Sequence, residues 1–248
     1  MKPFSLLIWE GCMMNTLLEL QNVQTKIDQF HILHDISFEV PKGEVTVLLG
    51  RNGAGKTTTL RTIMGLNPAT AGSIKFKGEE IKKWKPYMVA KSGIGYVPED
   101  QGVFSDLTVG ENLRVAIQKE DEKSARMLEW VLELFPDLKK FWNKPGGQLS
   151  GGQKQMLAIA RAYVNDNELL LIDEPSKGLA PIIVEKVMET IQQMKEKTTI
   201  VLVEQNFIMA SKIGDSFHII DDGQTVHKGL MSELKQDKVM MKKYLGIA

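Results

Sequence analysis

The sequence is poor in cysteine, in net charge and in long apolar runs. Its 248 residues include one cysteine, Cys12, so neither an intramolecular disulfide nor a cysteine metal cluster can form, and we expect a reducing compartment. Lys plus Arg and Asp plus Glu number 31 each. Because nucleic-acid partners usually require a basic excess, we expect no nucleic acid. No apolar run is long enough to cross a bilayer. The length suits one core with a smaller lobe.

The first 14 residues stand apart from the rest. The apolar residues 4–9 follow Lys2, as in a signal peptide, but the run is short and Glu10 ends it. We therefore predict a disordered extension over 1–14, or an upstream start codon, and one domain over 15–248.

A phosphate-binding pattern, G-x-x-x-x-G-K-[ST], lies between a predicted strand at 44–49 and a predicted helix at 58–64. The predicted binding residues are Gly50, Arg51, Asn52, Gly53, Ala54, Gly55, Lys56, Thr57 and Thr58. Glycines let backbone N–H groups turn toward a phosphate, and the helix start adds positive charge. Lys56 would reach the β- and γ-phosphates and Thr57 would ligate Mg²⁺. Kinases, GTPases and motor ATPases share this loop, so it indicates a nucleoside triphosphate only.

Strand and helix patterns predict an α/β fold. Predicted strands at 17–23, 36–40 and 72–78, bounded by short turns, form a small antiparallel sheet. Residues 87–165 change to helical patterns, which predicts an inserted helical subdomain. Strands resume at 169–172 and 199–203, followed by a hairpin with an Asp-Gly turn over 217–227 and a helical tail over 231–244.

The uniformly apolar strand at 169–172 ends in Asp173 and Glu174. Beside a phosphate loop, Asp173 would hold Mg²⁺ and Glu174 would act as general base toward the attacking water. These two residues alone leave another interpretation equally open, in which they only end a strand and begin a loop.

The segment 149–153, Leu-Ser-Gly-Gly-Gln, begins the predicted helix at 153–163 and offers a second anion-binding element. This pentapeptide is the signature of the ATP-binding-cassette (ABC) family. The phosphate loop, the signature and the strand at 169–174 follow that family's order and spacing, and the resemblance extends from about residue 17 onward. It implies a P-loop NTPase fold with a RecA-like parallel core, and ATP and Mg²⁺ as cofactors.

The resemblance also implies how subunits pair. Each ATP would lie between the phosphate loop of one subunit and the signature of another, which contributes Ser150, Gly151, Gly152 and Gln153. The second subunit would be the same chain or, as the resemblance favours, a paralogue. Dimer closure would drive membrane permease subunits, served indirectly by a solute-binding protein, at the cytoplasmic face of a bacterial or archaeal membrane.

Five further segments resemble the ATPases of branched-chain amino-acid importers: 96–100, 103–109, 155–162, 178–181 and 203–206. Urea importers are similar over the same span, and Glu99 and 178–181 favour the amino-acid group. A soluble ABC ATPase acting on ribosomes or DNA is a further alternative. Such proteins usually carry two cassettes or a coiled-coil insert, whereas this chain has one cassette and no heptad run.

Three positions depart from the general ABC pattern. Glu99 stands where glutamine usually offers an oxygen to Mg²⁺, and we predict it as a metal ligand with Thr57 and Asp173. Gln205 replaces the switch histidine and can donate a hydrogen bond to the γ-phosphate, so the predicted catalytic residues are Glu174, Gln205 and Lys56. Ile27 occupies the expected position of the adenine-stacking aromatic residue, with Phe30 the nearest ring.

Overall fold

The structure is a computed structural model that describes residues 16–246, so the predicted extension at 1–14 lies outside the described part. The chain forms two compact units. The first contains the described residues up to Val89 and those from Gly214 onward, and the second is Ala90–Ile213.

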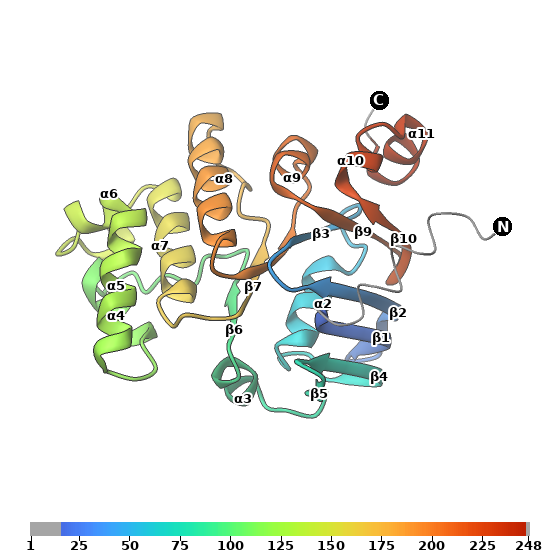
Figure 1. Cartoon of the computed structure of the whole chain (residues 1–248), viewed down its shortest axis with the longest axis horizontal. Helices are drawn as coiled ribbons and strands as arrows, with labels where there is room; N and C mark the ends of the chain where they lie inside the picture. The colour runs from blue at the N-terminus through green and yellow to red at the C-terminus, as the bar shows by residue number, and fades with distance from the viewer. Residues whose placement is uncertain (1–15, 247–248) are drawn as a thin grey trace. The chain divides into compact units, whose positions relative to one another are not determined.

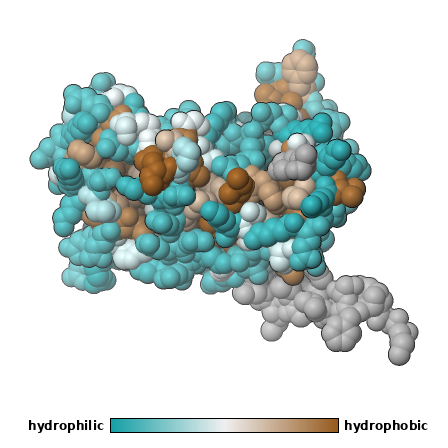
Figure 2. All heavy atoms as spheres, turned by 90° about the horizontal axis from the view of Figure 1, so that it is seen from above, coloured by the Kyte–Doolittle hydropathy of each residue, from teal (hydrophilic) through white to brown (hydrophobic). Residues whose placement is uncertain are grey.

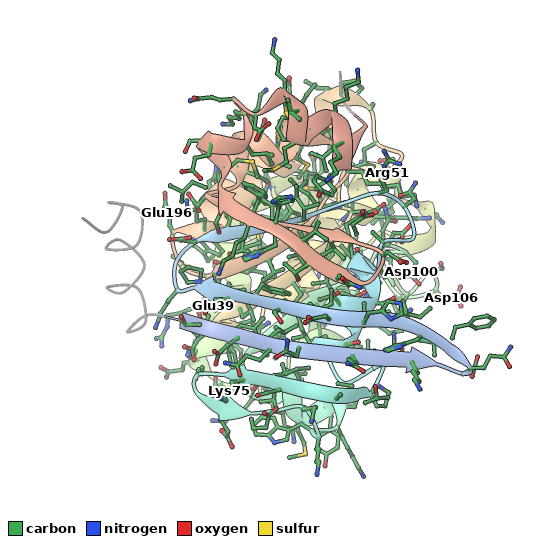
Figure 3. All side chains as sticks on the ribbon, turned by 90° about the vertical axis from the view of Figure 1, so that its right-hand side faces the viewer. Glu39, Arg51, Lys75, Asp100, Asp106 and Glu196 are labelled. Atoms are coloured by element: carbon green, nitrogen blue, oxygen red, sulfur yellow. The ribbon has the colours of Figure 1, made fainter. Side chains whose placement is uncertain are left out.

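In the first unit, an antiparallel sheet forms where short turns join successive strands. Strand β1 (Thr16–Ile27) pairs with β2 (Phe30–Pro41) on one side and with β4 (Ala69–Phe76) on the other, and β5 (Glu79–Glu80) extends the edge. Figure 3 shows these strands side by side, with Glu39 on β2 and Lys75 on β4. The predicted small antiparallel sheet is confirmed.

The same unit continues into strands that carry the phosphate loop. Strand β3 (Val45–Leu49), buried at every residue, pairs in parallel with β9 (Ser216–Asp221). The hairpin from β9 to β10 (Gln224–Leu230) is confirmed, and both turn residues have positive φ, 44° at Asp222 and 69° at Gly223. Helix α2 (Lys56–Ile63) follows the phosphate loop. Short helical segments end this unit: α10 (Met231–Leu234), α11 (Lys238–Met240) and a π-helical turn over Met241–Leu245.

In the second unit, three parallel strands lie in the order β6 (Ile94–Val97), β7 (Leu169–Asp173) and β8 (Thr199–Val203). Every residue of β7 and β8 is buried, which explains their uniformly apolar sequences. Strand β6 lies within the region predicted as helical. Four residues are too few to show a period, and its partner β7 is more than 70 positions away in the printed sequence, so local patterning did not reveal it.

Helices make up most of the rest of the second unit (Figure 1). Their bounds are α4 Val109–Ala116, α5 Glu122–Leu134, α6 Pro136–Lys140, the 3₁₀ turn η2 Gly146–Gln148, α7 Gly151–Tyr163, α8 Pro181–Lys195 and α9 Phe207–Ile213; α3 (Pro86–Lys91) precedes them. Helix α4 begins with a capping box, in which Thr108 Oγ1 accepts from the Glu111 amide at 3.2 Å and Glu111 Oε2 accepts from the Thr108 amide at 2.7 Å.

The surface seen in Figure 2 is largely hydrophilic, with separate hydrophobic patches. Among residues 16–246, no helix combines the length and the apolar character needed to cross a membrane.

Candidate functional site

Glycine is required by the backbone of the phosphate loop, which connects β3 to α2. The φ angles are 147° at Gly50, 80° at Gly53 and 107° at Gly55, all in the region that side chains disfavour. A Cβ atom on Gly50 would lie 2.1 Å from the carbonyl oxygen of Ile220, and one on Gly55 would lie 2.8 Å from Leu33 Cδ2. Gly50 therefore excludes a side chain on steric grounds as well, because its neighbour is backbone, whereas at Gly55 the end of the Leu33 side chain would have to shift.

The first turn of α2 carries the groups expected at a phosphate site. Helix α2 begins at Lys56, and its N-cap residue, Gly55, makes no side-chain capping hydrogen bond. Lys56 is 4% exposed, and its ammonium group donates to the carbonyl oxygens of Gly50 at 3.0 Å and Arg51 at 3.1 Å. These two contacts hold the ammonium group against the backbone of the loop. A cation at that position is what neutralisation of a phosphate bound by the loop would need.

The hairpin turn between β9 and β10 braces the phosphate loop. The Gly223 amide donates to the Ala54 carbonyl at 2.9 Å, and the Gly223 carbonyl accepts from the His34 amide at 2.8 Å. A Cβ on Gly223 would lie 2.2 Å from the Ile32 carbonyl oxygen. The sequence predicted this turn from its Asp-Gly pair, but its contact with the loop becomes visible only in the fold.

The acidic loop after β7 is in the second unit. Asp173, the last residue of β7, is fully buried, and Tyr96 Oη lies 3.4 Å from its Oδ2 atom. Glu174 adopts a left-handed conformation with φ 46°, and its amide donates to the Val203 carbonyl at 2.9 Å. This conformation is strained for a residue with a side chain, and such strain is concentrated at functional sites.

Three of the residues singled out by sequence lie close together in the second unit. Gln205 Nε2 donates to Glu174 Oε1 at 2.5 Å. Lys177 Nζ is 3.8 Å from Glu174 Oε2 and forms a short ion pair with Glu99 Oε1. Glu174 is therefore joined to Gln205 directly and to Glu99 through Lys177, a residue that sequence reasoning had not selected.

Glu204 is a second residue that sequence reasoning missed. Its buried carboxylate accepts from the Ser176 amide at 3.0 Å and from the Asn206 amide at 2.8 Å. It thereby ties the loop after β7 to the loop after β8. Burial raises the pKa of Glu204, opposed by the hydrogen bonds from Ser176 and Asn206. The sequence did contain a signal for Glu204, because an acidic residue there directly follows a buried strand. Sequence reasoning selected only its neighbour, Gln205.

The signature segment begins helix α7 through a capping box. Ser150 Oγ accepts from the Gln153 amide at 3.3 Å, and Gln153 Oε1 accepts from the Ser150 amide at 3.0 Å. The Ser150 hydroxyl thus acts as an acceptor toward its own helix, which leaves its proton for an anion. A Cβ on Gly152 would lie 2.7 Å from Ile183 Cγ2, whereas Gly151 has nothing within 4 Å.

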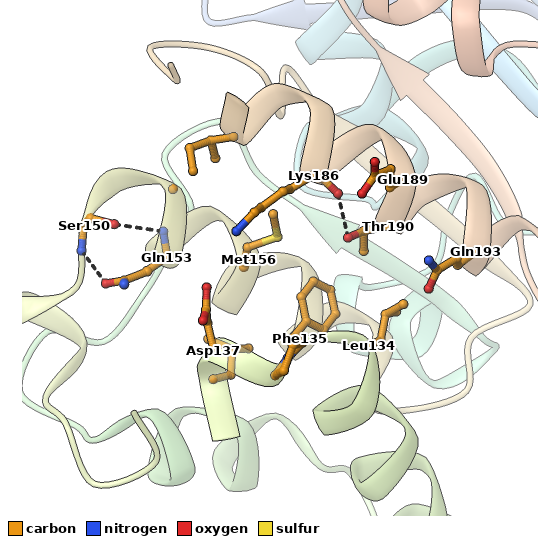
Figure 4. Close-up of a pocket in the computed structure, with 14 residues that line it drawn as sticks. Leu134, Phe135, Asp137, Ser150, Gln153, Met156, Lys186, Glu189, Thr190 and Gln193 are labelled. Atoms are coloured by element: carbon orange, nitrogen blue, oxygen red, sulfur yellow. Dashed lines mark hydrogen bonds between the residues drawn. The ribbon is translucent and has the colours of Figure 1, made fainter. Parts of the chain in front are cut away.

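A pocket of about 330 Å³ lies beside the signature (Figure 4). Ser150, Gly152, Gln153 and Met156 form part of its wall, and the end of α5, the start of α6 and one face of α8 supply the remainder. Lys186 and Asp137 extend into it from α8 and α6. The signature helix therefore starts at a hollowed and accessible surface.

The loop that contains Glu99 is anchored on both sides within the second unit. Arg161 of α7 donates to the Gly102 carbonyl and lies over the Phe104 ring at 4.6 Å. Asn112 of α4 is fully buried, donates to three carbonyls between Phe104 and Thr108, and accepts from the Phe104 amide at 3.0 Å. These contacts connect the loop of Glu99 with the signature helix.

The predicted metal ligands supply hard oxygen atoms, as Mg²⁺ requires. Among the described residues, no group of three His, Cys, Asp or Glu side chains forms a metal cage. Mg²⁺ in nucleotide sites keeps several waters and phosphate oxygens and uses one or two carboxylates. Asp173 and Glu99 in the second unit, and Thr57 in the first, are therefore donors of the type that Mg²⁺ uses beside a nucleotide, and a site made by all three stays a prediction. For adenine, Ile27 and Phe30 lie exposed at the β1–β2 turn, and stacking there stays a prediction.

Comparisons with known proteins agree with this geometry. The chain is 41% identical over 233 residues to the high-affinity branched-chain amino acid transport ATP-binding protein BraG of Pseudomonas aeruginosa, covering 93% of this chain and 100% of that protein. It is 36% identical to the probable branched-chain amino acid transport ATP-binding protein LivF of Archaeoglobus fulgidus, covering 88% and 94% of the two chains. A solved ATP-binding subunit of an ABC transporter superposes with a TM-score of 0.79 at 29% identity, covering 93% and 97%.

The family model for ABC transporters matches residues 33–177, which begin in β2 before the phosphate loop and end just after Glu174. With that match, and with 41% identity to a relative along its whole length, this chain belongs to the ABC transporter family, as one of its ATP-binding and ATP-hydrolysing subunits.

Proposed function

We propose that this chain is the ATPase subunit of an importer for branched-chain or other hydrophobic amino acids, acting on separate permease subunits at the cytoplasmic face of the membrane. The observation that carries the proposal is the full-length similarity to BraG, whose name specifies branched-chain amino acid transport. The segments around Glu99 and Gly178 agree with that group. A urea importer is the alternative, because its ATPases resemble the chain over the same span.

Each proposed residue has a defined task toward Mg²⁺·ATP. The phosphate-loop amides and Lys56 neutralise the phosphates. Thr57, Asp173 and Glu99 would hold Mg²⁺, which would supply positive charge to stabilise the transition state. Glu174 takes the proton of the attacking water, and Gln205 donates to the γ-phosphate. The hydrogen bond from Gln205 to Glu174 supports this division, because it holds the base beside the residue that reads the phosphate.

We propose that Ser150, Gly151, Gly152 and Gln153 serve the ATP of a second subunit. One phosphate loop and one signature per chain make two complete sites from two chains. The support is the start of α7, where the Ser150 hydroxyl proton and the glycine amides are available to an anion.

A mixed dimer tests this arrangement. Lys56→Ala and Ser150→Arg chains would each be inactive as homodimers. In a mixed dimer, one site carries both defects and the other carries neither, so mixing should restore part of the ATPase activity. If the two chains demonstrably mix without recovery, while a dimer with a single defect is active, the trans assignment is wrong.

Uptake measurements test the solute. In cells that lack this gene, the wild-type chain should restore uptake of labelled leucine and the Glu174→Gln chain should not. Restored urea uptake, with leucine uptake unchanged, would replace the amino-acid proposal by the urea alternative.

A further inference from the structure

Lys177 lies between two carboxylates that come from distant parts of the second unit. Its amide donates to the Glu174 carbonyl at 3.1 Å, which closes a turn and places its side chain beside the Glu174 side chain. Its ammonium group forms a short ion pair with Glu99 and is 3.8 Å from Glu174 Oε2. One cation thus contacts the predicted metal ligand and the predicted general base together.

The exposure of these groups shows that the contact does little for folding. Lys177 is 60% exposed and Glu99 is 38% exposed, whereas Glu174 is 10% exposed. Ion pairs at such exposed positions contribute little to stability. What the contact does determine is geometry, because two carboxylates facing one site repel each other unless a cation lies between them.

Lys177 remains a cation at this position. Its ammonium group donates a hydrogen bond to the Glu99 carboxylate, and a lysine side chain loses its proton only well above neutral pH. Its charge is therefore present throughout the pH range in which the carboxylates are ionised.

We propose that Lys177 is a positioning residue for ATP hydrolysis, which holds Glu99 and Glu174 at a fixed separation and releases Glu99 when the metal arrives with ATP. The inference rests on the proposed function, since it uses the assigned roles of Glu99 and Glu174. It adds a competition between the Lys177 ammonium and Mg²⁺ for the Glu99 carboxylate. Removing the lysine should therefore have one unfavourable effect, on turnover, and one favourable effect, on the Mg²⁺ requirement.

Without Lys177, Glu174 loses part of its orientation, and turnover at saturating substrate falls. Glu99 at the same time becomes available to the metal without competition, so less Mg²⁺ is needed for half-maximal activity. ATP affinity changes little, because the hydrogen bonds and ion pairs found for Lys177 join it to Glu99 and Glu174, and neither residue is assigned to phosphate binding. Removing a merely structural lysine would not lower the turnover and the Mg²⁺ requirement together.

The test compares Lys177→Met, Lys177→Arg and Lys123→Met in the full chain. Lys123 is the matched control, because it pairs with Asp166 at 2.7 Å with similar exposures of 70% and 39%, and none of its contacts involves the acidic loop. We expect Lys177→Met to lower kcat by about tenfold, the scale of a lost supporting contact, with KM for ATP within about twofold. Binding of a fluorescent, non-hydrolysable ATP analogue should reach half-saturation at a lower Mg²⁺ concentration than in the wild type. Lys177→Arg should recover most of the turnover, and Lys123→Met should match the wild type.

The inference is overturned if Lys177→Met keeps wild-type kcat and Mg²⁺ dependence, or if arginine restores nothing. Lys177→Gln serves as a second neutral variant should the methionine chain fold poorly. The Glu174→Gln chain distinguishes an error in the role of Lys177 from an error in the proposed role of Glu174. If Glu174→Gln is inactive while Lys177→Met is normal, only the role of Lys177 is wrong; if Glu174→Gln itself turns over at the wild-type rate, the proposed function of Glu174 is wrong.

A double variant provides a further criterion. Because Lys177 acts through Glu174, the Glu174→Gln/Lys177→Met chain should be no slower than Glu174→Gln alone. Independent, additive losses in the double variant would contradict a positioning role.

Discussion

The phosphate loop and the acidic loop acquire their shapes in different ways. In the phosphate loop, glycines with positive φ fix the backbone, and carbonyl oxygens of Gly50 and Arg51 fix Lys56. In the acidic loop, side chains separated by dozens of positions hold one another: Glu99 with Lys177, Glu174 with Gln205, and Glu204 with the Ser176 amide. A loop whose shape comes from its own backbone can be recognised in the sequence as a motif. A loop whose shape comes from distant side chains cannot.

The largest effect should come from the acidic loop. Glu174→Gln keeps the size of the side chain and its contact with Gln205 but cannot take a proton. We expect ATP turnover to fall by about 1,000-fold while ATP binding persists. Single-turnover hydrolysis and nucleotide-binding measurements check this, and turnover near the wild-type rate would remove Glu174 from the base role.

The phosphate loop should fail at binding instead. Lys56→Ala removes the ammonium group that the loop carbonyls position, and we expect ATP affinity to fall by about 100-fold, which corresponds to about 2.7 kcal/mol. Fluorescent-nucleotide titration checks the loss. Wild-type affinity in this variant would show that the loop is not the phosphate site.

Gly50→Ala tests whether the backbone of the phosphate loop requires glycine at this position. Its new Cβ would meet the Ile220 carbonyl, so we expect a loss of about 2–3 kcal/mol in the free energy of unfolding. Gly53→Ala is the control, because Gly53 also has positive φ but no atom within 4 Å, and should cost only about 1 kcal/mol. Equal losses in chemical denaturation would mean that φ strain, not the contact with β9, requires glycine at Gly50.

Glu204→Gln tests the side-chain contacts that hold the acidic loop. The amide keeps one acceptor oxygen, but its NH₂ group faces one of the two backbone amides that the carboxylate had satisfied. We expect a loss of about 1–2 kcal/mol in stability and a clear drop in turnover. The exposed Glu196 supplies a control in the same unit, since Glu196→Gln should leave both unchanged. Unaltered turnover with Glu204→Gln would show that the two loops hold their positions without this carboxylate.

His218 gives the smallest effect and concerns the first unit alone. Burial, assisted by the Lys228 charge, lowers the pKa of His218 to about 4. A lowered folded-state pKa means that the neutral ring is favoured, so its stability contribution is complete above pH 6.5 and is lost as the pH falls toward 4. Between pH 7 and 5.5 we expect the free energy of unfolding to fall by about 1 kcal/mol, and we expect no such fall in His218→Phe. Urea unfolding at the two pH values checks this, and identical pH slopes in both chains would contradict it.

The sequence by itself determined the elements whose causes are local. The glycine and lysine spacing of residues 50–58, the apolar run before Asp173, the capping boxes at Thr108 and Ser150 and the Asp-Gly hairpin are each written in consecutive residues, and the structure contains all of them. The resemblance in the same motifs identified the family.

Tertiary structure decided what depends on partners far along the chain. Strand β6 exists because β7 offers it a parallel neighbour, and the hairpin turn at Gly223 braces the phosphate loop only after β9 has paired with β3. Lys177 and Glu204 have ordinary local sequences, and their importance arises from the carboxylate and amides that folding brings to them. Hydrogen bonds and ion pairs act over a few ångströms, so a sequence reveals them only where short separation along the chain already guarantees short separation in space.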